Sequence, residues 1–143
     1  MKIIPYVLFN GNCEEAVSFY QSILGGELNI IRYNQLPEKE KQPLSDKWSN
    51  KIMHSSLSFK DGYSIYFSDT WEGTPVEKGN NLTIHINLGS EQQVYDVFKK
   101  LSDGGKAAMP AEKTFWGSVY GSFEDRFGVC WGIEFEIPGS DKM

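Results

Sequence analysis

The sequence has little of what defines several large classes of protein. Its 143 residues include only two cysteines, Cys13 and Cys130, which are too few for a disulfide framework, and we expect both to be free thiols in a reducing compartment. It has no glycine-rich phosphate loop and no H-E-x-x-H motif, so nucleotide binding and metalloprotease chemistry are not supported. Positive charge is not clustered either. The 14 Lys and Arg residues stand against 19 Asp and Glu residues, a net charge of −5 that argues against binding to nucleic acid or to anionic membranes.

Signals for export or for membrane insertion are also missing. The chain begins Met1-Lys-Ile-Ile-Pro5, without the apolar core or the cleavage site of a signal peptide, and it contains no apolar run long enough to span a bilayer. The composition, 40% hydrophobic and 14% aromatic, is typical of a folded chain of single-domain length. We therefore expect a cytoplasmic protein, one domain over residues 1–143, whose partner is a small organic molecule or another copy of itself.

An internal repeat is the main feature that the sequence does contain. Asn12 and Ser90 each begin a pattern typical of a helix N-cap with a capping-box residue three positions later, Glu15 and Gln93 respectively. Ser90 stands 78 positions after Asn12, and apolar residues follow both at the same helical spacing until a pair of glycines ends each pattern. The sequence therefore predicts two equivalent helices.

The strand predicted before each helix obeys the same offset. Residues 4, 6 and 8 are apolar and alternate as residues 82, 84 and 86 do, which indicates the face of a half-buried strand that a helix covers. We call the opposite face, which the helix of the same module does not cover, the open face. It is predicted to hold the intervening residues, which are Pro5, Val7 and Phe9 in the first copy and Thr83, His85 and Asn87 in the second.

After each helix the pattern predicts three more strands. A hairpin motif at residues 58–62, Ser-Phe-Lys-Asp-Gly, is repeated at 122–128 as Ser-Phe-Glu-Asp-Arg-Phe-Gly, and an alternating strand follows each. We predict an α+β fold of two tandem β-α-β-β-β modules, about 1–70 and about 82–138, with a linker over about 71–81. Residues 35–50, around Trp48, form a long polar insertion that is either solvated or acts as a lid or dimer contact.

Paired modules of this kind resemble the vicinal oxygen chelate superfamily, which includes glyoxalase I, bleomycin-resistance proteins and extradiol dioxygenases. The motifs are similar to those of its PhnB-like branch, sometimes labelled 3-demethylubiquinone methyltransferase-like: Phe-Trp-Gly at 115–117 and Asp-x-Phe-Gly-x-x-Trp at 125–131. The resemblance implies a curved mixed sheet with helices on its outer face, a concave wall that binds a ligand, and a homodimer that would cover exposed sheet edges. It assigns no activity by itself. Methyltransferase activity is not expected, because no dinucleotide-type glycine loop follows the first strand.

The resemblance also locates a metal site, and here the sequence departs from it. Metal-dependent members carry His, Glu or Gln at four positions of the wall, which by register are Pro5, Tyr66, Thr83 and Gly132 in this chain. Proline and glycine side chains offer no donor atom, and threonine and tyrosine are rare ligands of these divalent ions. We therefore expect no standard metal site and no cofactor.

A relocated metal site is the alternative. His54, His85 and Glu134 would all point inward in this register, and three such ligands with a water molecule could hold zinc. The protein would then be a metal-dependent lyase, isomerase or dioxygenase. A Cys130 nucleophile with His54 as its base is a weaker alternative, since nothing in the sequence brings the two together.

Aromatic residues complete the predicted site. Tyr66 and Tyr120 share the open face by register, and Trp116 lies in a glycine-rich loop at its rim; rings with a polar tip suit a planar or amphipathic organic ligand. We predict a ligand-binding set that consists of Phe9, Tyr66, His85, Trp116 and Tyr120. If the protein is an enzyme, His54 or Glu134 would be its acid or base. The sequence leaves open a binding module without turnover, an enzyme, and a structural dimer whose rings only pack together.

Overall fold

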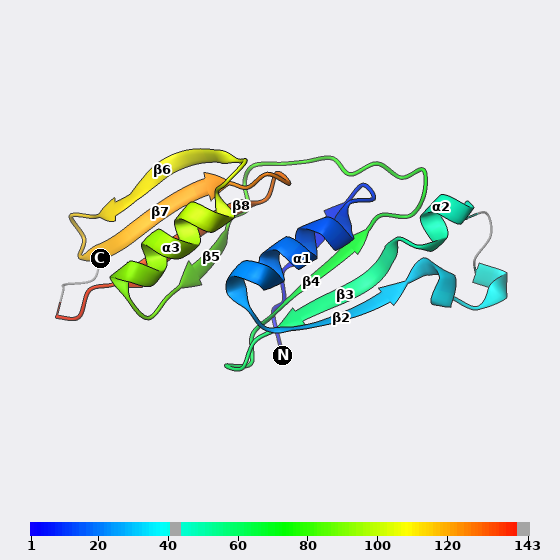
Figure 1. Ribbon diagram of the computed structural model, residues 1–143, viewed down its shortest axis with the longest axis horizontal. Coiled ribbons are helices and arrows are strands. Elements are labelled where there is room, and N and C mark those ends of the chain that lie inside the picture. The colour runs from blue at the N-terminus through cyan, green and yellow to red at the C-terminus, as the bar shows by residue number, and fades with distance from the viewer. Residues whose placement is uncertain (41–43, 140–143) are drawn as a thin grey trace. The chain divides into compact units, whose positions relative to one another are not determined.

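The structure is a computed structural model that describes residues 1–40 and 44–139, and it divides them into two compact units, Met1–Glu77 and Lys78–Met143. Each unit contains one four-stranded mixed sheet and one long helix (Figure 1). The predicted α+β class and the two β-α-β-β-β modules are confirmed. Within the described ranges, no helix is both long enough and apolar enough to cross a membrane.

The first unit is built around a sheet with the strand order β1-β4-β3-β2. Its elements are β1 (Tyr6–Phe9), α1 (Cys13–Leu24), β2 (Glu27–Arg32), β3 (Ile52–Ser58) and β4 (Ser64–Asp69). β1 runs parallel to β4, and the other neighbours are antiparallel. α1 crosses one face of this sheet (Figure 1), where Tyr20 of the helix stacks on Phe67 of β4 with ring centroids 5.5 Å apart. Both rings are fully buried, so the core of this unit lies between helix and sheet.

The second unit repeats this plan with the strand order β5-β8-β7-β6. Its elements are β5 (Ile84–Asn87), α3 (Glu91–Leu101), β6 (Lys106–Lys113), β7 (Ser118–Glu124) and β8 (Cys130–Glu136). Phe98 of α3 packs edge-on against Phe123 of β7 at 5.1 Å between ring centroids, and Trp131 of β8 is fully buried. β8 lies between its parallel partner β5 and its antiparallel partner β7.

The predicted insertion contains regular structure of its own. Two 3₁₀ turns, Tyr33–Gln35 and Glu38–Glu40, are followed by the short helix α2 (Asp46–Ser49), while residues 41–43 lie outside the described residues. The side chain of Ser45 accepts a hydrogen bond from the backbone of Trp48, and the Trp48 ring nitrogen donates to the carbonyl oxygen of Thr70 over 3.0 Å. The insertion is therefore attached to the segment that follows β4. Its predicted role as a lid or a dimer contact stays a prediction.

The two helices begin in different ways. Ser90 caps α3 as predicted, by accepting from the backbone of Gln93, and Gln93 in turn accepts from the backbone of Gly89. Asn12 makes no side-chain cap bond to α1. Its place is taken by the buried carboxylate of Asp69, at the end of β4, which accepts from the amide of Cys13 over 3.0 Å. The predicted capping box of the first helix is therefore wrong, because a tertiary contact supplies the acceptor instead.

The predicted faces of β1 are also wrong. Phe9 is buried and stacks on Phe67 on the helix side, whereas Tyr6 and Leu8 are about half exposed on the open face. Pro5 falls on the Phe9 side by alternation, so it does not belong to the open face. In the sheets, Tyr6 is the Cα partner of Tyr66 in β4, and His85 is the Cα partner of Gly132 in β8. The first strands of the two modules are therefore equivalent with an offset of 79 residues rather than 78. The sequence misled because residues 4–9 are mostly apolar at both parities.

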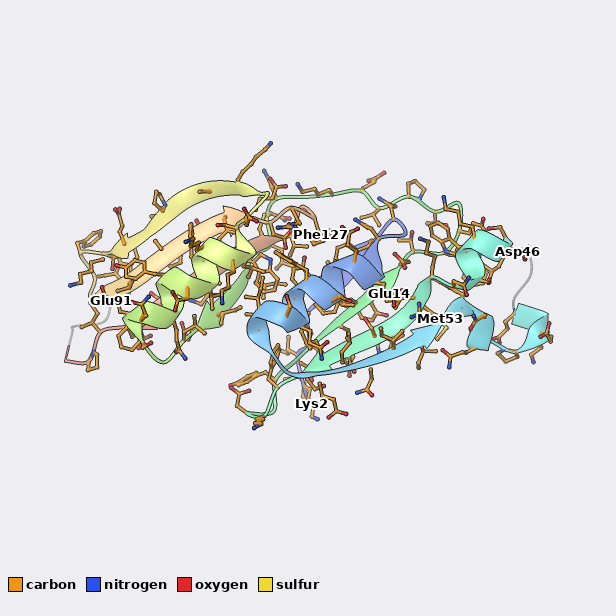
Figure 2. The ribbon with its side chains drawn as sticks, viewed as in Figure 1. Lys2, Glu14, Asp46, Met53, Glu91 and Phe127 are labelled. Carbon is orange, nitrogen blue, oxygen red and sulfur yellow. The ribbon has the colours of Figure 1, made fainter. Side chains whose placement is uncertain are left out.

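The motif Asp-x-Phe-Gly-x-x-Trp at 125–131 forms the turn between β7 and β8, where Figure 2 labels Phe127. One oxygen of the buried Asp125 carboxylate accepts from the amides of Phe127 and Val129, at 2.8 and 3.0 Å, and the other accepts from the ring nitrogen of Trp131 at 2.8 Å. Gly128 closes the turn at a φ of +88°, which favours glycine. The motif therefore fixes where β8 begins.

We predict that Asp125→Ala lowers the free energy of unfolding by about 3 kcal/mol, because three donors lose their acceptor, of which the Trp131 ring nitrogen is buried and the other two are partly buried. Urea unfolding followed by circular dichroism measures the change. Asp61→Ala, in the exposed β3–β4 turn, is the matched control and should stay within about 0.5 kcal/mol of the wild type. Equal effects of the two substitutions would show that the Asp125 network does not stabilise the fold.

Candidate functional site

The open face of the second sheet carries a group of side chains that we call the polar–aromatic cluster. Its members come from β5, β7, β8 and the turn before β7, and they are His85, Asn87, Trp116, Tyr120 and Glu134. The register of β8 brings them together, because Cα pairing sets His85 beside Gly132 and sets Glu134 beside both Asn87 and Tyr120. The apolar residues of β8, at alternate positions, face α3 instead.

Glu134 is the hydrogen-bonding centre of the cluster. Its Oε1 lies 3.0 Å from Nε2 of His85, and its Oε2 accepts from the ring nitrogen of Trp116 at 3.5 Å. The same Nε2 lies 3.2 Å from Oδ1 of Asn87. Because a carboxylate can only accept, the proton of a neutral His85 ring lies on Nε2, and Nδ1 keeps its lone pair.

Gly132 lies beneath the rings of the cluster. The planes of His85 and Tyr120 are only 18° apart, with centroids at 6.0 Å, and the Trp116 ring lies 6.2 Å from that of Tyr120. A Cβ atom on Gly132 would lie 3.0 Å from Nδ1 of His85 and 3.3 Å from the hydroxyl oxygen of Tyr120. A larger residue at this position would displace one of the two polar groups, so the glycine is what allows them to converge here.

The pKa of Glu134 is lowered from the ordinary glutamate value. Partial burial acts to raise this pKa, but hydrogen bonds from Ser118, His85 and Trp116, together with the charge that His85 can carry, outweigh it. Glu134 is therefore ionised at neutral pH and holds His85 in the tautomer described above.

The first unit has a smaller cluster on its own open face. The hydroxyl of Tyr6 lies 2.9 Å from Nδ1 of His54, and the ring of Tyr66 stands edge-on to both, with centroids 4.8 Å from His54 and 5.8 Å from Tyr6. The sequence named His54 and Tyr66 as candidates and missed Tyr6, because the one-residue slip in β1 placed it under the helix.

The predicted site residues thus fall into three groups. His85, Trp116, Tyr120 and Glu134 lie together in the second unit, whereas His54 and Tyr66 belong to the first. The prediction that Phe9 lines the open face is wrong, since its ring is 4% exposed and packs in the core. The sequence assigned Asn87 to the open face but did not include it in the site. Its position two residues after His85, on the same face of the strand, could have indicated that it belongs there.

The residues at the four standard positions do not suit the divalent ion of the metal-dependent members. Pro5 and Gly132 have no side-chain donor, and tyrosine and threonine, which rarely bind these ions, stand at positions 66 and 83. In the alternative trio, His54 belongs to the first unit and both His85 and Glu134 to the second, and a site that joins them stays a prediction. Across residues 1–40 and 44–139, no group of three His, Cys, Asp or Glu side chains is arranged to hold a metal. The thiol alternative likewise pairs Cys130 of the second unit with His54 of the first, and it stays a prediction.

A hollow of about 640 Å³ lies in the first unit, beside the first turn of α1, where Figure 2 labels Glu14. Three of the charged residues that line it, Glu14, Arg32 and Asp69, already have partners. Arg32 binds Glu14 at 2.6 Å between nitrogen and oxygen, and the Asp69 carboxylate accepts from three backbone amides. We therefore place the candidate site at the polar–aromatic cluster, where Nδ1 of His85 and the Tyr120 hydroxyl converge on one point.

Comparisons with known proteins agree on one group of relatives. A family model described as 3-demethylubiquinone-9 3-methyltransferase matches residues 1–134. Protein YjdN of Escherichia coli K12 is 30% identical over 142 residues, which cover 93% of this chain and 94% of that protein. The crystal structure of PA1353 from Pseudomonas aeruginosa is 36% identical, with a TM-score of 0.85 and coverage of 96% of this chain and 98% of that one.

Two further structures are similar in fold. A putative 3-demethylubiquinone-9 3-methyltransferase, PhnB protein, from Bacillus cereus is 23% identical, with a TM-score of 0.76, and covers 94% of this chain and 99% of its own. A glyoxalase/bleomycin resistance protein/dioxygenase from Nocardioides is 15% identical, with a TM-score of 0.56 and coverage of 99% and 87%. The predicted resemblance is therefore confirmed at the level of family and fold.

We predict that the stability difference between the wild type and Glu134→Gln depends on pH. Because the folded-state pKa of Glu134 is lowered, its ionised form stabilises the protein above the unfolded value, near 4.3, and this contribution is lost as pH falls through the folded value. The wild type should be more stable by about 1 kcal/mol at pH 7. Urea unfolding across pH 3 to 7 measures the difference, with the exposed Glu77→Gln as control. A difference that does not change with pH would contradict the prediction.

Proposed function

The chain belongs to the PhnB-like family described as 3-demethylubiquinone-9 3-methyltransferase, which has the glyoxalase fold, and on this premise we propose that it binds a small organic molecule at the polar–aromatic cluster. The observation that carries the proposal is the convergence of hydrogen-bonding groups and rings on one sheet face. Ligand sites combine apolar walls with a few fixed polar groups, and this cluster offers both.

The cluster supplies distinct kinds of contact. The rings of Trp116 and Tyr120 offer apolar surface for a planar or amphipathic molecule, while His85 and Tyr120 offer an acceptor and a hydroxyl. The side chain of His85 is 43% exposed and that of Glu134 is 16% exposed, so His85 is the group that a ligand can reach. Glu134 is less accessible and orients the His85 ring through the hydrogen bond between them.

We propose binding rather than methyl transfer, although the family description names a methyltransferase. A cofactor site of the dinucleotide type needs free backbone amides after the first strand. In this chain the amides of Gly11 and Cys13, in the β1–α1 connection, already donate to the carboxylate of Asp69. Assembly as a homodimer, which the resemblance implies, stays a prediction.

We predict that naphthalene-based fragments with one polar group bind saturably and shift the indole N–H resonance of Trp116. Trp116→Leu should weaken their binding about 3- to 10-fold, because an aromatic contact contributes roughly 0.5–1.5 kcal/mol beyond the area that it buries. Nuclear magnetic resonance titration of ¹⁵N-labelled protein measures both effects.

Trp71→Leu is the matched control, because Trp71 is a partly exposed tryptophan of the first unit that packs on Tyr33. It should leave fragment affinity unchanged, and circular dichroism verifies that both variants fold. Fragments that shift residues of the first unit and not the Trp116 resonance would place the ligand elsewhere and refute the proposal.

A further inference from the structure

We propose that the ligand of this site carries a hydroxyl group on an apolar body, and that the hydroxyl is held between Nδ1 of His85 and the hydroxyl of Tyr120. The inference rests on the proposed function, since it names the ligand chemistry of the same site. It makes His85 and Tyr120 the residues that determine specificity.

The first step is the tautomer of His85. Nε2 faces two acceptors, the carboxylate of Glu134 at 3.0 Å and Oδ1 of Asn87 at 3.2 Å, so the ring proton is held there. Nδ1 is then an acceptor whose lone pair lies in the ring plane. The orientation is fixed on the protein side, because a rotated or flipped ring would leave the partly buried carboxylate of Glu134 without this donor.

The second step is the position of Nδ1. This atom and the hydroxyl oxygen of Tyr120 both lie within 3.3 Å of the point that a Cβ atom on Gly132 would occupy. The two atoms therefore lie near each other over Gly132. The proposal places the ligand hydroxyl on the solvent side of this point, between the two atoms. The β8 register fixes this arrangement, since Gly132 is the Cα partner of His85 and lies two residues before the partner of Tyr120.

The third step is the match between these two groups and a ligand. An alcohol can donate to Nδ1 and accept from the Tyr120 hydroxyl at the same time, which satisfies both. An ether or a ketone only accepts, so it leaves Nδ1 without a donor. A carboxylate only accepts as well, and it would lie close to the ionised Glu134. The hydroxyl is therefore the neutral group that fits both sides.

The fourth step is the apolar body. Trp116 lies beside Tyr120, and Phe115 stands edge-on to Trp116 at 5.1 Å with 87% of its surface exposed. A hydroxyl held above Gly132 thus has aromatic surface next to it. These rings favour a flat or elongated hydrocarbon part over a sugar or a polyol.

The test compares three probes that differ only in the polar group: 2-naphthalenemethanol, its methyl ether and 2-naphthalenemethylamine. We expect the alcohol to bind about 5- to 10-fold more tightly than the ether, the range of one hydrogen bond of ordinary strength. His85→Phe should remove most of this preference while leaving the affinity for the ether within about 2-fold. Tyr120→Phe should weaken the alcohol and the ether by a similar factor, because both accept a hydrogen bond from the Tyr120 hydroxyl. Tyr63→Phe, an exposed tyrosine of the first unit, should leave both affinities unchanged.

A second measurement tests the tautomer without any ligand. The ¹⁵N chemical shifts of the neutral His85 ring should show a protonated Nε2 and an unprotonated Nδ1. Glu134→Gln should weaken this preference, because an amide can present either a donor or an acceptor. This measurement keeps the inference testable even if His85→Phe or Tyr120→Phe fails to fold.

The outcomes separate the two proposals. Equal binding of alcohol and ether, tighter binding of the amine, or a proton on Nδ1 would overturn the hydroxyl inference and leave the binding proposal standing. If none of the three probes shifts the Trp116 resonance, the binding proposal fails and the inference fails with it.

Discussion

The position of β8 between β5 and β7 is the constraint on which the polar–aromatic cluster depends. Its register sets Gly132 beside His85 and Glu134 beside Tyr120, so that regular strands, rather than loops, place the polar groups. A slip of one residue would turn the buried ring of Trp131 to the open face and the carboxylate of Glu134 into the core. The same indole that drives the burial also binds the motif carboxylate of the β7–β8 turn, which ties the register to a fixed starting point.

The second module could be predicted from the sequence because its strands are apolar at one parity only. In β5, Ile84 and Ile86 alternate with His85 and Asn87, and burying the polar pair without partners would cost far more than burying the apolar pair. The assignment of residues to the two faces of β5 therefore followed from this alternation alone. The distances within the cluster did not follow, since they depend on the tilt of each ring over Gly132, which no alternation pattern encodes.

The first strand of the first module is apolar at both parities, so its faces could not be predicted from the sequence. Tyr6 and Leu8 are as compatible with burial as Val7 and Phe9, so hydrophobic periodicity leaves the face of β1 undecided and tertiary packing decides it. The helix cap failed for a related reason. Asn12 has the local chemistry of an N-cap, but a carboxylate from the distant end of β4 supplies the acceptor. Contacts of high sequence separation decided both features, and one sequence without its relatives does not contain them.

The donor set changes what controls recognition at this site. Where a metal ion holds a ligand, coordination is decided by the ion and by the deprotonated side chains around it. At Gly132 there is no side chain to coordinate, and the glycine instead lets His85 and Tyr120 approach the strand. What His85 offers to a ligand then depends on which ring nitrogen holds the proton. Glu134 settles this through a bond on the opposite nitrogen, so that in the proposed site a residue that need not touch the ligand would govern the polarity of the group that contacts it.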